Sequence, residues 1–329
     1  MVKWSRYSPD LLLQSENDLI RLSGVEIERR NVCIGRGLFL HCLTCGDPAN
    51  PPMILLHGYC GSGLIFFKIL KRLVENYRIY IVDHLGMGRS TRPEFIPNTL
   101  ESAEEFFVEP LEIFRQIEGI DKFILVGHSF GGYISGCYAL KYPEHVSKVL
   151  YLSPVGFGKK PKEFDFLKEL EGDWWIRFVN KFMVFFWLKN ITPVSLIRKC
   201  GPITGHFFKA YARDRLNSLT KEENHAVGNY LEQINIMPGS GEYGLVYILE
   251  PGVWARSPLC ARFEKSKTPM AFFFGDIDWV KPDGARQLEK NYSGKMLIYM
   301  ISHSDHHLYW DNPQELAEKM IEAIEVLDS

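Results

Sequence analysis

The stretch FILVGHSFGGYISGCYALKYP, residues 123–143, places a serine between two apolar segments. The first segment is a short apolar run that predicts a buried strand, and the second has the spacing of a helix. Between them, residues 127–131 have the form G-x-S-x-G with Ser129 at its centre. Alone, this pattern is weak and also occurs at a glycine-rich helix start. Between a strand and a helix it predicts a tight turn that exposes the Ser129 hydroxyl.

Length and composition indicate a soluble globular protein. The chain has 329 residues, of which 46% are hydrophobic and 24% charged, so it can bury a substantial core. One large α/β domain with an insertion fits this length. The formal net charge is −2, and we see no run of five or more basic residues. Binding to the phosphates of nucleic acid leaves such a basic footprint, so we expect no nucleic-acid partner.

The seven cysteines are an odd number spread along the chain, which disfavours a disulfide framework. We therefore expect an intracellular, reducing compartment. Cys42 and Cys45 form a C-x-x-C pair, but no further cysteine or histidine cluster accompanies it, so a structural role is favoured over zinc or redox chemistry. The first 24 residues fit neither a secretory signal nor an acid-poor transit peptide.

Short apolar runs alternate with segments of helical spacing along most of the chain. This alternation predicts an α/β fold with a mostly parallel sheet flanked by helices. The predicted strands are residues 38–44, 53–58, 78–83, 122–127, 147–153, 270–275 and 296–301, and the predicted helices are residues 64–75, 101–118, 130–141 and 313–327.

The alternation stops after Ser153 and resumes near Thr268. We therefore divide the chain into an N-terminal core part, 1–154, a helical lid insertion, 155–267, and a C-terminal core part, 268–329. Within the insertion, WWIRFVNKFMVFFWLK (174–189) is too short and too charged for a comfortable transmembrane helix. It is either a buried helix or a lid that contacts acyl chains and a membrane surface through its aromatic side chains, Trp174, Trp175, Phe178, Phe182, Phe185, Phe186 and Trp187.

A serine hydroxyl becomes a nucleophile only when a base removes its proton and a third group orients that base. The segment ISHSDHHLYWDNP (301–313) supplies three histidines after the last predicted strand. His306 fits best, because it precedes an H-x-x-x-x-D-x-P run that leads into the last helix. His307 and His303 remain alternatives.

The orienting acid is expected in FFFGDIDWVKP (272–282), at the end of the preceding strand. We choose Asp278 over Asp276. The order Ser129, Asp278, His306 is the serine–acid–histidine order of one hydrolase class. The backbone N–H of Phe130, at the start of the predicted helix, is one candidate donor to an oxyanion. The N–H of Tyr59, in the glycine-rich segment LLHGYCGSG (55–63), is the second.

These motifs resemble the α/β-hydrolase superfamily over most of the chain. The resemblance is carried by LLHGYCG, DHLGMGRSTRP, GHSFGGY, LKYPEHV, FGDIDWVKP and HHLYWDNP. The segments ITPVSLIRKCGP and GVWARSPLCARF of the insertion are similar to a lipid-handling subfamily. This subfamily includes the lipid-droplet lipase co-activator, N-acylphosphatidylethanolamine lysophospholipases and mitochondrial cardiolipin deacylases. One branch of it lacks the serine and acts as a binding regulator, whereas this chain keeps Ser129.

The resemblance implies cleavage of acyl esters of phospholipids or lysophospholipids, with no metal or organic cofactor. It implies a lipid or acyl-ester substrate and a site in the cytoplasm or at a peripheral membrane surface, including a mitochondrion or a lipid droplet. Protein partners are unknown. The H-x4-D stretch from His306 to Asp311 is also read as an acyltransferase signature, but a loop histidine followed by an acidic helix cap and a proline suffices to explain it. The alternatives are a small-ester carboxylesterase, a catalytically idle lipid-binding scaffold or complex subunit, and an acyltransferase.

Overall fold

The computed structural model describes residues 7–163, 184–199 and 218–329. Its centre is an eight-stranded sheet in the order β1-β2-β4-β3-β5-β6-β7-β8. The first three strands of this order pair antiparallel, and the remaining neighbours pair parallel. The predicted α/β class with a mostly parallel sheet is therefore confirmed. The strands are β1 (Glu28–Gly35), β2 (Leu38–Cys45), β3 (Pro52–Leu56), β4 (Arg78–Val82), β5 (Phe123–His128), β6 (Val146–Leu152), β7 (Met270–Gly275) and β8 (Met296–Ile301).

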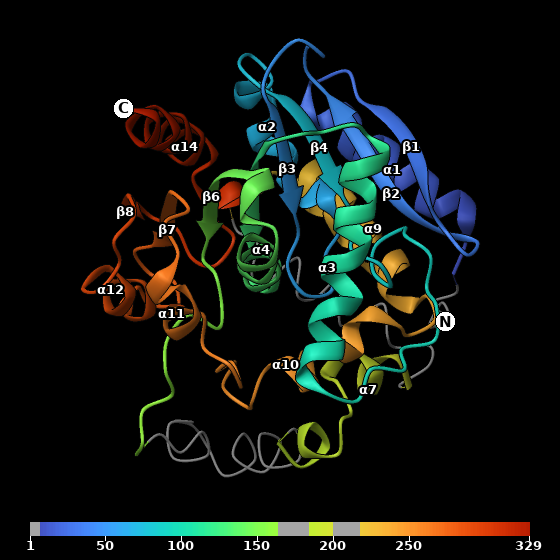
Figure 1. Cartoon of the computed structure of the whole chain (residues 1–329). Coiled ribbons are helices and arrows are strands. Elements are labelled where there is room, and N and C mark those ends of the chain that lie inside the picture. The colour runs from blue at the N-terminus through green and yellow to red at the C-terminus, as the bar shows by residue number, and fades with distance from the viewer. Residues whose placement is uncertain (1–6, 164–183, 200–217) are drawn as a thin grey trace.

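Helices cover both faces of this sheet. Figure 1 shows α3 (Leu100–Ile117) and α4 (Phe130–Lys141) in front of it. These two helices share one buried cluster with α10 (Gly244–Ile248), α11 (Leu259–Arg262) and α12 (Asp283–Glu289). The opposite cluster contains α1 (Pro9–Ser23), α2 (Phe67–Leu73), α9 (Lys221–Ile236), α13 (Leu308–Asp311) and α14 (Pro313–Asp328). Residues 184–188 and α7 (Pro193–Lys199) are also helical, and short 3-10 turns occur at Gly63–Phe66, Pro143–His145, Gly241–Tyr243 and Phe263–Lys265.

Helix α1, strand β1 and the short helices α12 and α13 lie outside the sequence prediction. Strand β1 is an edge strand, and only its residues Val32 and Ile34 are buried. It therefore lacks the continuous apolar run that marks the central strands. Helix α1 is attached to the sheet through the buried carboxylate of Glu16, which pairs with Arg29 at 3.1 Å and His41 at 2.9 Å. The sequence nonetheless marks both ends of α1, with Ser8 as the N-cap, Pro9 in the first turn and Gly24 as the C-cap.

The C-x-x-C pair belongs to β2 and is structural. Cys42 and Cys45 are three residues apart on a strand, so their side chains point to opposite faces, where each joins a different buried cluster. Both are free thiols, and burial raises the pKa of each to about 12. A thiol with such a pKa is a poor nucleophile and metal ligand at neutral pH.

Candidate active site

Ser129 lies in a sharp turn between β5 and α4. Its φ of 53° and ψ of −116° are strained for a residue with a side chain. The turn is possible because glycines flank it. A Cβ on Gly127 would lie 2.3 Å from the Ser135 hydroxyl, and one on Gly131 would lie 2.4 Å from the His57 carbonyl oxygen. Small residues therefore allow α4 to start against the end of β3, with the serine side chain at the apex of the turn.

The Ser129 hydroxyl contacts one of the three histidines expected near it. Its Oγ lies 2.9 Å from His306 Nε2. The other ring nitrogen, Nδ1, lies 3.3 Å from Asp278 Oδ1. Asp278 is fully buried, and its Oδ1 also accepts the backbone N–H of Val280 at 2.9 Å. Loops after β5, β7 and β8 thus bring together a hydroxyl, an imidazole and a carboxylate in the arrangement that activates a serine.

The alternative histidines and acid have other contacts. His307 Nδ1 lies 2.7 Å from the Tyr309 hydroxyl. His303 is exposed, and its backbone N–H donates to Asp276 Oδ2 at 3.0 Å. Asp276 also accepts the N–H of Ser304, and these backbone hydrogen bonds lower the pKa of its carboxyl group. Asp276 therefore shapes the turn after β8.

Asp311, the acid of the H-x4-D stretch, supports the histidine loop. Its Oδ2 accepts the backbone N–H of Asp305 at 2.9 Å, and its Oδ1 accepts the Ser218 hydroxyl at 2.6 Å. The expected acidic cap is wrong, because the cap of α14 is the next residue, Asn312, whose side chain accepts the N–H of Glu315. The H-x4-D spacing therefore has a structural explanation in this fold, because the acid fixes the backbone that carries His306.

The two backbone amides expected to bind an oxyanion, those of Tyr59 and Phe130, border the same cavity as Ser129. Within the described part of the chain, neither N–H donates a hydrogen bond. The Tyr59 loop approaches Ser129 closely, because a Cβ on Gly58 would lie 3.1 Å from Ser129 Cβ. Asn235 of α9 steadies this loop by donating to the Cys60 carbonyl oxygen at 2.9 Å. Two unengaged donors beside a nucleophile can stabilise a developing negative charge.

Two buried neutral histidines hold the start of that loop. His57 Nε2 accepts the backbone N–H of His84 at 3.1 Å, and its Nδ1 donates to the Gly58 carbonyl oxygen at 2.8 Å. His84 Nε2 in turn donates to the His57 carbonyl oxygen at 3.0 Å. Burial lowers the pKa of both imidazoles, so both stay uncharged at neutral pH.

His128, which precedes the serine, is a functional candidate that the sequence reasoning missed. Its Nε2 donates to the backbone carbonyl oxygen of His306 at 2.9 Å. Burial, together with the neighbouring His306 and His307, holds the pKa of His128 well below its usual value. The only available signal was a histidine inside G-x-S-x-G, and that pattern does not reveal which backbone group it meets.

A cavity of about 530 Å³ opens beside Ser129. Its walls are mostly apolar, and they come from both the predicted core parts and the predicted insertion. They include Ile65, Val155, Trp187, Val194, Ile197, Leu231, Leu245, Leu249, Val253 and Trp279. Such a cavity suits a ligand with a long apolar part and one polar group near the serine. The Trp279 ring lies 4.9 Å from the His306 ring at the same site.

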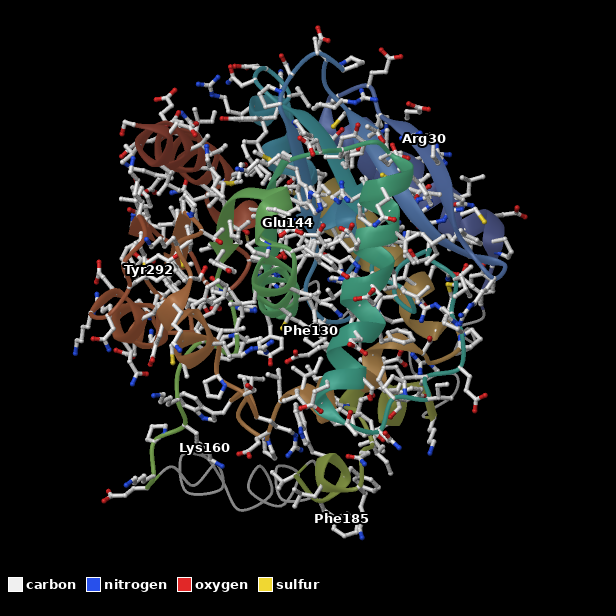
Figure 2. All side chains as sticks on the ribbon, in the orientation of Figure 1. Arg30, Phe130, Glu144, Lys160, Phe185 and Tyr292 are labelled. Atoms are coloured by element: carbon white, nitrogen blue, oxygen red, sulfur yellow. The ribbon has the colours of Figure 1, made fainter. Side chains whose placement is uncertain are left out.

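The predicted aromatic lipid-binding residues are only partly covered by the described chain. Trp174, Trp175, Phe178 and Phe182 lie outside the described residues. Phe185 is 55% exposed and stands at the outer edge of the molecule in Figure 2. Of the described aromatic residues in this segment, Trp187 lines the cavity, and its Nε1 donates to the Leu249 carbonyl oxygen at 3.0 Å. Phe185 and Phe186 are not among the lining residues.

Two features are absent from the described ranges 7–163, 184–199 and 218–329. Within these ranges, no group of three His, Cys, Asp or Glu side chains is arranged to hold a metal ion. None of the helices in these ranges has the length and hydropathy needed to cross a membrane.

Comparison with known proteins agrees with the fold. Residues 51–313 match the family model described as the alpha/beta hydrolase fold, and the chain belongs to this family. It is 28% identical to a 1-acylglycerol-3-phosphate O-acyltransferase of Arabidopsis thaliana, over 95% of this chain and 79% of that protein. It is 26% identical to a human (lyso)-N-acylphosphatidylethanolamine lipase, over 80% of this chain and 75% of that protein.

A solved structure shows the same architecture. The naproxen esterase of Bacillus subtilis matches with a TM-score of 0.67 and 17% identity, covering 96% of this chain and 99% of that one. At this identity the likeness concerns the fold alone. The predicted α/β-hydrolase fold is confirmed, and the names of the sequence relatives confirm the resemblance to its lipid-handling members.

Proposed function

We propose that this protein is a serine hydrolase that cleaves acyl esters of phospholipids or lysophospholipids. One observation carries the proposal: the Ser129 hydroxyl lies 2.9 Å from His306 Nε2, with Asp278 behind the imidazole, at the wall of an apolar cavity. A binding protein has no need of such an arrangement, whereas acyl transfer through a serine depends on it.

In the proposed mechanism, Ser129 Oγ attacks the acyl carbonyl carbon while its proton passes to His306 Nε2. Asp278 stabilises the resulting imidazolium, and the N–H groups of Tyr59 and Phe130 bind the oxyanion. When the tetrahedral intermediate collapses, His306 protonates the leaving alcohol. Water, deprotonated by the same imidazole, then attacks the acyl-enzyme. As the second tetrahedral intermediate collapses, His306 returns the proton to Ser129 Oγ and the fatty acid is released.

The lipid part of the proposal is supported by the cavity and its surroundings. Apolar walls can accept an acyl chain, and side chains from both the core and the insertion form them. We therefore propose that residues 155–267 act as a lid between the core parts 1–154 and 268–329. Trp279 is 51% exposed, and Leu188, next to Trp187, is 66% exposed. Exposed apolar side chains beside a cavity suit docking on a lipid surface.

Transfer of the acyl group to an acceptor other than water is a second candidate, because several sequence relatives bear the name of an acyltransferase. Hydrolysis and transfer share the acyl-enzyme and differ only in what attacks it. Asp311 supports the loop that carries His306, which explains the H-x4-D spacing structurally. The spacing therefore does not distinguish hydrolysis from transfer. Incubation with a labelled lysophospholipid and a second acceptor lipid distinguishes the two, because hydrolysis releases free fatty acid and transfer forms a diacylated product.

The first test is labelling of the purified protein with a fluorophosphonate probe. We expect Ser129→Ala and His306→Ala to abolish labelling, with activity falling by about 10⁶-fold, whereas His307→Ala keeps labelling. Circular dichroism establishes that each variant is folded. If folded wild-type protein is not labelled, even with lipid vesicles present, the proposal is wrong and a non-catalytic lipid-binding scaffold is favoured. A small-ester carboxylesterase is indicated instead if activity falls sharply as the acyl chain lengthens.

A further inference from the structure

A second groove adjoins the candidate active site. It has a volume of about 950 Å³ and is formed by the loop after β6, the turn at 252–254 and the segment 279–290 after β7. Val155, Val253 and Trp279 line both this groove and the apolar cavity. Because Trp279 also contacts the His306 ring, the two spaces are separated by one layer of side chains at the candidate catalytic histidine.

Close backbone approach builds this groove. A Cβ on Gly284 would lie 2.4 Å from the backbone nitrogen of Gly158, and a Cβ on Gly158 would lie 3.4 Å from Gly284 Cα. The start of α12 and the loop after β6 therefore meet without side chains between them. This contact fixes the loops that carry the charged residues of the groove.

The lining of the groove is strongly cationic. Lys159, Lys281, Arg286 and Lys290 line it, with Asp283 as its one carboxylate among the described residues. In the chain as a whole, acidic residues slightly outnumber basic ones, 40 to 38. Within the described ranges, none of these four cations forms an ion pair, whereas nearby Lys160 pairs with Glu250 at 2.9 Å. A concentration of unpaired positive charge attracts an anion.

We propose that this groove binds the phosphate headgroup of a glycerophospholipid whose ester bond is at Ser129. This inference rests on the proposed function and deepens it. With the acyl chain in the apolar cavity, the glycerol part passes along the side of Trp279 that is exposed, and the phosphate reaches the cations beyond it. Lysine provides a point charge for phosphate, and the Arg286 guanidinium can donate two parallel hydrogen bonds.

The chain offers a matched control groove at the opposite end of the sheet. Lys122, Lys265 and Lys267 line a groove where β5, β6 and β7 begin, whereas the proposed headgroup groove lies where β6 and β7 end. Ligands of open α/β sheets bind at the carboxyl ends of the strands. Neutralising the control lysines changes the net charge equally but leaves the proposed site intact.

The experiment compares two esters with the same acyl chain, lysophosphatidate and uncharged monoacylglycerol, each as a monomer below its micellar concentration. We expect Lys281→Gln/Arg286→Gln/Lys290→Gln to lower the ratio of kcat/KM for lysophosphatidate to that for monoacylglycerol by about 10- to 100-fold, mainly through KM. The control variant Lys122→Gln/Lys265→Gln/Lys267→Gln should leave this ratio unchanged. If the ratio of kcat/KM for lysophosphatidate to that for monoacylglycerol is the same in both triple variants, the proposal is wrong.

Binding to Ser129→Ala protein separates this inference from the proposed function. Lysophosphatidate is added stepwise to the protein while tryptophan fluorescence is measured. Trp254 and Trp279 of the groove contribute to this signal. Weaker binding in the groove variant but not in the control variant supports the groove even if wild-type protein cleaves neither ester, a result that would refute only the hydrolase proposal. Inorganic phosphate is the second probe. If it displaces lysophosphatidate at concentrations similar to those of the lipid, the groove takes free phosphate and the headgroup assignment is wrong.

Discussion

At the scale of single residues, the site depends on how one imidazole is aimed. His306 and His307 are neighbours with the same chemistry, yet only His306 Nε2 meets the Ser129 hydroxyl. The backbone of His306 is held from two sides. His128 Nε2 donates to the carbonyl oxygen of His306, and the backbone N–H of His306 donates to Asp305 Oδ1 at 2.8 Å. His128 is therefore a positioning residue in the proposed mechanism.

We predict that His128→Ala lowers kcat by about 10- to 100-fold, because a small displacement of the base weakens the reactive geometry. KM should change little, since the apolar cavity keeps most of its walls. His128→Gln, which retains an N–H donor, should restore part of the activity. Steady-state kinetics on one ester measures both constants. If kcat is unchanged in His128→Ala, or if Ala and Gln behave alike, the hydrogen bond to His306 has no positioning role.

At the scale of elements, the site depends on how closely α4 approaches the end of β3. Gly131 faces the carbonyl oxygens of Leu56 and His57 at distances that leave no room for a side chain. This contact sets the Phe130 N–H beside the loop that carries the Tyr59 N–H. Because the obstacles are backbone atoms, they cannot rotate away as the end of a side chain can.

We predict that Gly131→Ala lowers the free energy of unfolding by about 1–3 kcal/mol through overpacking, and also lowers kcat by separating the two amides. The matched control is Gly136→Ala in the same helix. Its Cβ would meet the flexible end of Leu259, and alanine is favoured over glycine in a helix interior by about 1 kcal/mol. Urea unfolding of both variants provides the measurement. If Gly131→Ala and Gly136→Ala lower the free energy of unfolding equally, the close contact of α4 with β3 does not contribute specifically to stability.

At the scale of the whole molecule, stability should depend on three buried neutral histidines, His57, His84 and His128. Their pKa values are lowered in the folded protein, mainly by burial. Below the ordinary pKa of about 6.5, the unfolded chain binds protons at these positions and the folded protein does not. The unfolded state therefore gains stability as the pH falls.

We predict that the free energy of unfolding falls by up to about 4 kcal/mol per pH unit between about pH 6 and pH 5, about 1.4 kcal/mol for each histidine. Above pH 7 these groups should contribute no slope. Denaturant unfolding across this range measures the effect. His84→Gln should reduce the slope by about a third, whereas exposed His225→Gln should leave it unaltered. A flat profile between pH 7 and pH 5 would contradict the prediction.

The sequence by itself determined the architecture of the central sheet and the candidate residues Ser129, Asp278 and His306. The central strands are buried on both faces and appear as continuous apolar runs, and the turn at Ser129 needs small neighbours that the glycines at 127 and 131 reveal. The order of serine, acid and histidine followed from the loops after successive strands. Strand β1 escaped prediction because an exposed edge strand lacks a continuous apolar run. Helix α1 was missed although Ser8, Pro9 and Gly24 mark its ends.

Only the tertiary structure decided which groups meet. In the structure His306, and not His307, contacts Ser129, because the fold of the loop fixes the direction of each side chain. The sequence shows only the type of each residue. The tertiary structure gave His128 and Asp311 their backbone partners and set Trp187 rather than Phe185 at the cavity wall. It also gathered cations from separate segments into one groove. Spatial proximity between distant segments follows from packing the whole chain, and no local pattern encodes it.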